Sequence, residues 1–176
     1  MIAQLRRAVV WLSRNAQSFG GDPTQLHVIG HSSGAHLTGV LLTTDWHGLG
    51  AAENILKSGA CVSGMYELRP VLLSARSSYV TLSADEEDAL SAIRHLDRVR
   101  CPILVAYGEK ESPEFQRQGR EFAAALKAKG RAVKELILPA CNHFEGIRLM
   151  MDPRSTLARA VLAPLGLAPS DRPSIK

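Results

Sequence analysis

Residues 26–41 read LHVIGHSSGAHLTGVL, and this stretch decides the fold. The apolar run at 26–29 predicts a short strand, and the spacing of Leu37, Val40 and Leu41 predicts an amphipathic helix. Between them lies Gly30-His31-Ser32-Ser33-Gly34, which matches the pattern G-x-S-x-G. A strand that runs into a helix through this pattern is the setting of a nucleophile elbow. The sharp turn of such an elbow holds the serine hydroxyl out at the carboxyl end of a sheet.

The rest of the chain alternates apolar runs of strand length with stretches of helical periodicity. Such an alternation predicts an α/β fold, a parallel sheet of about four strands with helices on both faces. We therefore expect a single domain over residues 1–176. The expected strands are 26–29, 56–63, 101–107 and 133–138. Helices are expected where apolar residues recur at helical spacing, over 5–19, 37–41, 115–126 and 157–165. Another helix is expected over 85–96.

The segment between the second and third expected strands, residues 65–98, is mixed in pattern. We expect it to form a cap or insert over the pocket, with Trp46, Tyr66 and Tyr79 either as aromatic walls of that pocket or as ordinary packing.

Composition restricts the partners. Lys and Arg number 21 against 17 Asp and Glu, and the excess forms no basic stripe, so we expect no nucleic-acid partner. No apolar run approaches the ~20 residues of a transmembrane helix, so we expect no membrane partner. The first 19 residues are rich in arginine, but their apolar run is too short for a targeting segment. Cys61, Cys101 and Cys141 are too few for a disulfide framework and predict a reducing, cytoplasmic location.

A serine nucleophile needs a histidine base, and after an elbow the chain order is serine, acid, histidine. Of six histidines, only His143 follows the fourth expected strand, in the loop 141–144. We therefore expect Ser32 as the nucleophile and His143 as the base. The backbone N–H of Ser33, at the start of the helix, is expected to stabilise the oxyanion.

The acid is expected in the loop after the third strand, which contains Glu109, Glu111 and Glu114. Glu114 falls in the first turn of a helix, where a favourable interaction with the helix dipole is enough to explain an acidic residue. From the residues alone, Glu109 and Glu111 stay as alternatives.

Three features suggest other sites but are explained more simply. His47-Gly48-Leu49-Gly50 mimics an H-G-G-G oxyanion loop, but it follows the nucleophile, whereas that loop precedes it. Cys141 lies near His143, but neither has a partner at CxxC or HxxxH spacing. The acidic run 85–88 suits the solvated first turn of a helix. We expect no metal and no cofactor.

Six short stretches follow one another along nearly the whole chain: 19–23 (FGGDP), 30–37 (GHSSGAHL), 43–46 (TTDW), 63–70 (SGMYELRP), 111–115 (ESPEF) and 142–144 (NHF). The first two resemble the branch of the α/β-hydrolases that holds carboxylesterases and kynurenine formamidases, and the other four resemble its formamidase (arylformamidase) side. The resemblance implies that Ser32 is the nucleophile, His143 the base and Glu111 the acid, in a position where the family has Asp.

The expected function is that of a cofactor-independent serine hydrolase that cleaves a small acyl or formyl group from an arylamine. The resemblance makes N-formylkynurenine a candidate substrate. The alternatives are a short-chain carboxylesterase and a truncated, non-catalytic α/β fragment.

In the family that the chain resembles, the nucleophile strand lies in the middle of the sheet, and several strands precede it. Here one expected helix precedes residue 26. We therefore expect Met1 to be an internal methionine of a longer frame or the start of a truncated product. The chain is then expected to lack the upstream strands and the H-G-G oxyanion loop. Such a chain is expected to have little activity and to self-associate through the exposed edge of its first strand.

Overall fold

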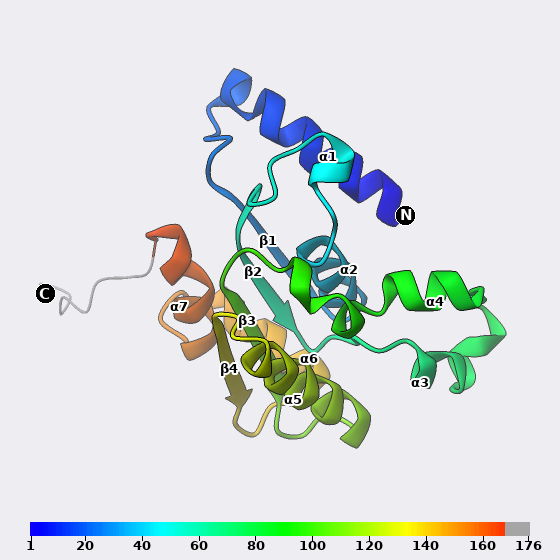
Figure 1. Ribbon diagram of the computed structural model, residues 1–176. Helices are drawn as coiled ribbons and strands as arrows, with labels where there is room; N and C mark the ends of the chain where they lie inside the picture. Colours follow the sequence, from blue (N-terminus) through cyan, green and yellow to red (C-terminus); the bar gives the residue numbers. More distant parts are fainter. Residues whose placement is uncertain (168–176) are drawn as a thin grey trace, which may run out of the picture.

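The computed structural model describes residues 1–167, built around one sheet of four parallel strands (Figure 1). The strands lie side by side in sequence order: β1 (Leu26–His31), β2 (Leu56–Val62), β3 (Ile103–Gly108) and β4 (Val133–Leu138). Every neighbouring pair is parallel, so the carboxyl ends of all four strands meet at one edge of the sheet. The predicted α/β fold is confirmed.

Helices cover both faces of this sheet. They are α1 (Ile2–Asn15), α2 (Ser33–Leu42), α3 (Arg69–Leu72), α4 (Ala84–Leu90), α5 (Pro113–Ala128), α6 (His143–Arg148) and α7 (Thr156–Leu162). On one face, α2 and α5 pack against the sheet around Leu42, Val105 and Phe122, and α1 packs on α2. On the other face, α7 packs around Val62 and Leu157. These two apolar layers hold the carboxyl ends of the strands in fixed positions.

Strand β1 forms one edge of the sheet. Its outer side has no strand partner within residues 1–167, and Ile29 on it is 46% exposed, whereas β2 is almost wholly buried. An unpaired strand edge offers backbone N–H and C=O groups to another chain. Self-association through this edge stays a prediction.

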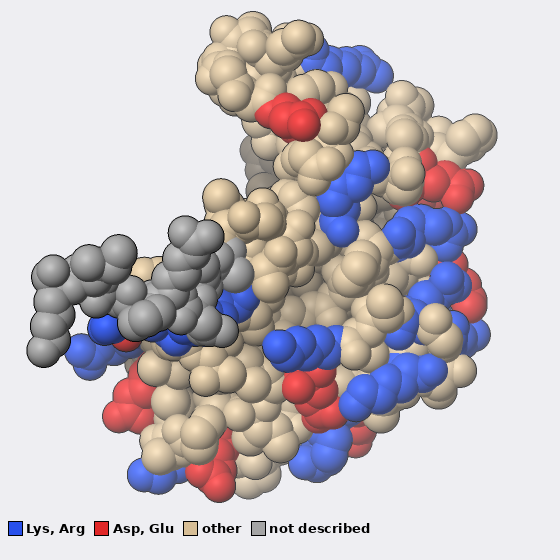
Figure 2. Space-filling view, turned by 90° about the vertical axis from the view of Figure 1, so that its left-hand side faces the viewer, with Lys and Arg blue, Asp and Glu red and all other residues tan. Residues whose placement is uncertain are grey.

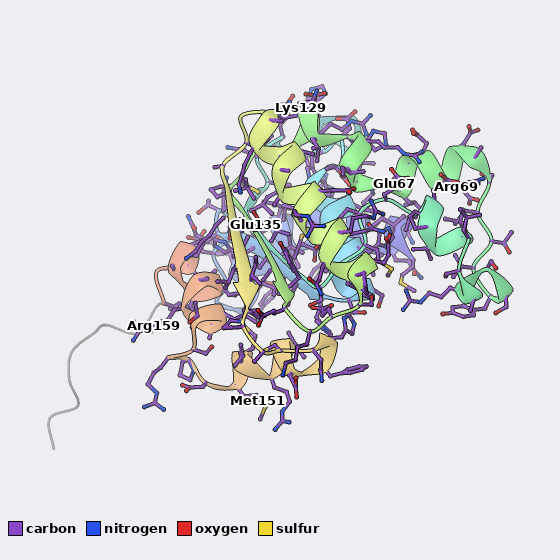
Figure 3. The ribbon with its side chains drawn as sticks, turned by 90° about the horizontal axis from the view of Figure 1, so that it is seen from below. Glu67, Arg69, Lys129, Glu135, Met151 and Arg159 are labelled. Carbon is purple, nitrogen blue, oxygen red and sulfur yellow. The ribbon has the colours of Figure 1, made fainter. Side chains whose placement is uncertain are left out.

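Residues 65–98 leave the sheet after β2 and extend to one side of it as α3, α4 and three 3-10 turns (Figure 1). Figure 3 shows Glu67 and Arg69 at the root of this segment. Arg94 binds the carboxylates of Glu67, Glu87 and Asp88, which ties the end of the segment to its beginning.

The helix expected over 85–96 ends at Leu90, so that prediction is wrong in its second half. Ser91 is buried, and its hydroxyl accepts a hydrogen bond from the backbone N–H of Leu68 at 3.0 Å. The N–H of Ile93 donates to the carbonyl of Tyr66 at 3.1 Å. These tertiary bonds replace the helical ones.

One expected apolar contact is also wrong, and two open alternatives are decided. Phe19 lies in a 3-10 turn after α1, is 58% exposed and stacks on Trp11 rather than on the core. Trp46 and Tyr66 are buried in the core, with Tyr66 stacked on Phe122, so of the two alternatives expected for them the structure shows ordinary packing.

The surface carries both signs of charge: Lys and Arg alternate with Asp and Glu over the face shown in Figure 2. Within residues 1–167, no helix combines the length and the apolar character that crossing a membrane requires.

Candidate active site

Ser32 lies at the point where β1 passes into α2. Its backbone has φ 57° and ψ −120°, a conformation that residues other than glycine rarely adopt. The N–H of Ser32 donates to the carbonyl of Val62, while its own carbonyl accepts from the N–H groups of Ala35 and His36. Because strand and helix both fix this residue, they can impose a strain of about 1–3 kcal/mol. The turn has the geometry of a nucleophile elbow.

Close packing of β1 on α2 depends on Gly30. A Cβ atom there would lie 2.1 Å from the carbonyl oxygen of Gly34 and 2.6 Å from Oγ1 of Thr38. A Cβ atom on Gly34 would meet nothing within 4 Å. Of the two glycines of the motif, only Gly30 is therefore required for the close packing of strand and helix.

We predict opposite effects of alanine at these two glycines. Gly30→Ala forces the strand and the helix apart, and we expect it to lower the free energy of unfolding by about 3 kcal/mol. Gly34→Ala adds a helix-favouring residue within α2, and we expect no loss and a gain of up to about 1 kcal/mol. Denaturant unfolding followed by circular dichroism measures both. Equal stability of the two variants would contradict this explanation of the elbow.

His143 reaches both Ser32 and Glu111. Its Nε2 lies 2.9 Å from Oγ of Ser32, and its Nδ1 lies 2.8 Å from Oε2 of Glu111. An ionised carboxylate only accepts hydrogen bonds, so Nδ1 carries the proton and donates it to Glu111. Nε2 is then free to accept the hydroxyl proton of Ser32. The three residues singled out from the sequence form one continuous chain of hydrogen bonds.

His143 is the first residue of α6, so its expected place in a loop is wrong. The side chain of Asn142 accepts from the N–H groups of Phe144 and Glu145, and the Glu145 side chain accepts from the N–H of Asn142. This reciprocal capping starts the helix and fixes the backbone that carries the imidazole. The spacing N-x-x-E was the available sequence signal.

Glu111 is buried and fully hydrogen-bonded. Its side chain has no exposed area, and its Oε1 accepts from Oγ of Ser63 at 2.5 Å and from the N–H of Gly108 at 2.7 Å. With His143 on Oε2, the carboxylate has three partners, which compensate its burial. Sequence reasoning assigned no role to Ser63, although it opens the stretch 63–70 and directly follows β2.

The other two glutamates of this loop have different partners. Glu109 is exposed, and its Oε2 accepts from the N–H of Ala140. Glu114 lies in the first turn of α5 and binds Arg117. The structure therefore brings Glu111, and neither Glu109 nor Glu114, to His143.

Three aromatic rings surround the imidazole of His143. The centroids of Phe115, His31 and Phe144 lie 4.5, 4.7 and 5.3 Å from that of His143. Nε2 of His31 also donates to the backbone carbonyl of His143 at 2.9 Å. These contacts hold the imidazole in place between Ser32 and Glu111.

Ser33 is the first residue of the ten-residue helix α2. Its N–H lies at the positive end of the helix dipole, directly beside the Ser32 hydroxyl in sequence. Its role as an oxyanion donor stays a prediction.

This fold and this site belong to one class of proteins, the α/β-hydrolases. Residues 3–123 match the carboxylesterase family, and the chain belongs to that family.

Two curated relatives are kynurenine formamidases. The one from Danio rerio is 34% identical over 175 residues, and the one from Salmo salar is 33% identical over 176; each alignment covers 94% of this chain and 57% of the relative. The chain thus spans just over half of the length of these relatives. Among solved structures, esterase 2 of Thermogutta terrifontis superposes with a TM-score of 0.69 at 21% identity, over 96% of this chain and 66% of that one.

Proposed function

We propose that the protein is a serine hydrolase that cleaves a formyl or small acyl group from an arylamine. The observation that carries the proposal is the hydrogen-bond chain from Ser32 through His143 to Glu111. The likeness to kynurenine formamidases supports the choice of an N-formyl substrate.

In the proposed reaction, Oγ of Ser32 attacks the carbonyl carbon while Nε2 of His143 takes its proton. Glu111 keeps the imidazole in the required tautomer and stabilises the imidazolium that forms. The N–H of Ser33 stabilises the oxyanion of the tetrahedral intermediate. His143 then protonates the leaving nitrogen, the C–N bond breaks, and a formyl or acyl ester remains on Ser32. A water molecule activated by His143 hydrolyses this ester and releases the acid.

A second candidate is a short-chain carboxylesterase, which the family match favours. An ester would pass through the same steps with an alcohol as the leaving group.

We also propose a cytoplasmic location. Cys61, Cys101 and Cys141 are all free thiols, which supports a reducing compartment.

The two candidates differ in the substrate that is cleaved with the highest kcat/KM. We expect this value for N-formylaniline to exceed that for a twelve-carbon aryl ester at least tenfold, with a two-carbon aryl ester between them. The Ser32→Ala variant measures the background. Highest efficiency on the two-carbon ester would favour the carboxylesterase, and highest efficiency on the twelve-carbon ester would contradict both candidates.

A further inference from the structure

Strand β1 has an outer edge that faces no other strand within residues 1–167. The N–H of Ser32, directly after β1, donates to the carbonyl of Val62 on β2. Because backbone groups point to alternate sides along a strand, the N–H and C=O groups of His27, Ile29 and His31 point away from β2. Each of these three residues therefore offers a donor and an acceptor to a strand from outside.

An apolar surface adjoins this edge on the face of the sheet that carries α7. Ile29 is 46% exposed, and it lines a cavity of about 400 Å³. The other lining residues include Ala60 of β2, Leu104 of β3 and Val161 of α7. A strand added along β1 would remove the Ile29 side chain from water, so hydrophobic burial would add to the backbone hydrogen bonds.

The opposite edge of the sheet is protected against such pairing. Strand β4 carries Lys134 and Glu135, and the Glu135 carboxylate lies 2.9 Å from Nζ of Lys127 on α5 (Figure 3). Charged side chains on an edge strand hinder its pairing with another chain. Strand β1 reads Leu-His-Val-Ile-Gly-His and contains no Lys, Arg, Asp, Glu or Pro. Of the two edges, β1 is therefore the one that is open to another strand.

We propose that β1 pairs with β1 of a second copy of this chain, antiparallel and about a two-fold axis at Ile29. The inference goes beyond the proposed function and does not depend on it. In this register Ile29 faces its own counterpart, and His27 of each copy faces His31 of the other. Each facing pair exchanges two N–H···O=C bonds, about six in all. The two sheets would join into a single sheet of eight strands.

The occupant is a second copy because the edge complements itself. The three residues with outward backbone groups are spaced symmetrically about Ile29, so one two-fold rotation gives every donor an acceptor. The same rotation brings both Ile29 side chains together on the α7 face. Such a contact is closed, since it uses the open edge of both copies and leaves only the charged β4 edges at the ends. We therefore expect a dimer of twice 19.1 kDa and no longer polymer.

Sedimentation equilibrium over a range of protein concentrations tests the pairing. We expect Ile29→Lys to raise the dissociation constant of the dimer by about tenfold or more, because it places two ammonium groups opposite each other across the axis. The matched control is Ile137→Lys: Ile137 is 53% exposed on β4, and its replacement should leave the dissociation constant within about twofold. A chain that is monomeric at every concentration, a polymer longer than the dimer, or equal effects of the two variants would overturn the proposal.

A cross-link tests the register. The Cα atoms of a hydrogen-bonded antiparallel pair lie about 5.5 Å apart, a distance that a disulfide spans. We therefore expect Ile29→Cys to give a disulfide-linked dimer under mild oxidation, with the bond assigned to position 29 by mass spectrometry. Ile137→Cys contains the same native thiols and is the control, and it should stay unlinked. Absence of a link at position 29, or a link that forms as fast in Ile137→Cys, would overturn the pairing about Ile29.

Discussion

Ser32→Ala is expected to lower kcat by on the order of 10⁶-fold and to abolish labelling by a fluorophosphonate. The reason is geometric: Oγ of Ser32 lies 2.9 Å from Nε2 of His143, whose Nδ1 is in turn held by Glu111, so this hydroxyl has an oriented base positioned to take its proton. Without the oxygen we expect no acyl-enzyme to form, so that only substrate binding and the oxyanion donor proposed at Ser33 are left to act. Mass spectrometry of the labelled protein, together with turnover of N-formylaniline, measures both effects.

The control is Ser18→Ala, which removes an exposed hydroxyl that donates to the carbonyl of Asn15. It should keep both labelling and turnover within about twofold, because the change is far from the β1–α2 turn. Labelling that persists in Ser32→Ala would show that another hydroxyl is the reactive one.

The elbow and the sheet could be predicted from sequence because their signals are local. The strand β4 was predicted with its observed bounds, and the elbow follows from a motif placed between an apolar run and a periodic one. Both depend on residues that are neighbours in the chain. Prediction failed where a segment depends on partners far away, as at Ser91, whose hydroxyl binds the N–H of Leu68 and ends α4 early.

The choice between Glu109 and Glu111 shows the same limit within the site. Both residues lie in one short loop, and the residue pattern alone left both as alternatives. What separates them is the packing of the loop: the carbonyl of Cys141 comes so close to Gly108 that a Cβ atom there would lie 2.3 Å from it. In this packed loop the N–H of Gly108 and the hydroxyl of Ser63 both donate to Glu111. Ser63 arrives from β2, so the arrangement depends on how β2 and β3 are paired.

Glu111→Gln is expected to lower kcat by about 10⁴-fold, although the side chain keeps its shape. The amide oxygen can still accept from Ser63 and Gly108, which directs the NH₂ group toward Nδ1 of His143. A donor at that position forces the imidazole into the tautomer with its proton on Nε2. Nε2 then cannot accept the proton of Ser32, and attack on the carbonyl is blocked.

Glu109→Gln is the matched control, because it makes the same chemical change two residues away. The Glu109 carboxylate is exposed and binds the N–H of Ala140, a bond that an amide oxygen also accepts, so we expect kcat within about threefold of the unaltered protein. Denaturant unfolding of both variants separates a loss of activity from a loss of fold. Retained turnover in Glu111→Gln together with its loss in Glu109→Gln would reverse the assignment of the acid.

Glu111→Asp tests whether the loop is built for the longer side chain. Shortening by one methylene withdraws the carboxylate from His143, or from Ser63 and Gly108, since one short side chain cannot span the positions of all three partners. A misplacement of about 1 Å in such a site lowers the rate by about 10²-fold, so we expect a kcat between those of the unaltered protein and Glu111→Gln. Full activity in Glu111→Asp would show that the loop adjusts to either acid. An intermediate kcat would show that Ser63 and Gly108 hold the carboxylate at the distance that only glutamate reaches.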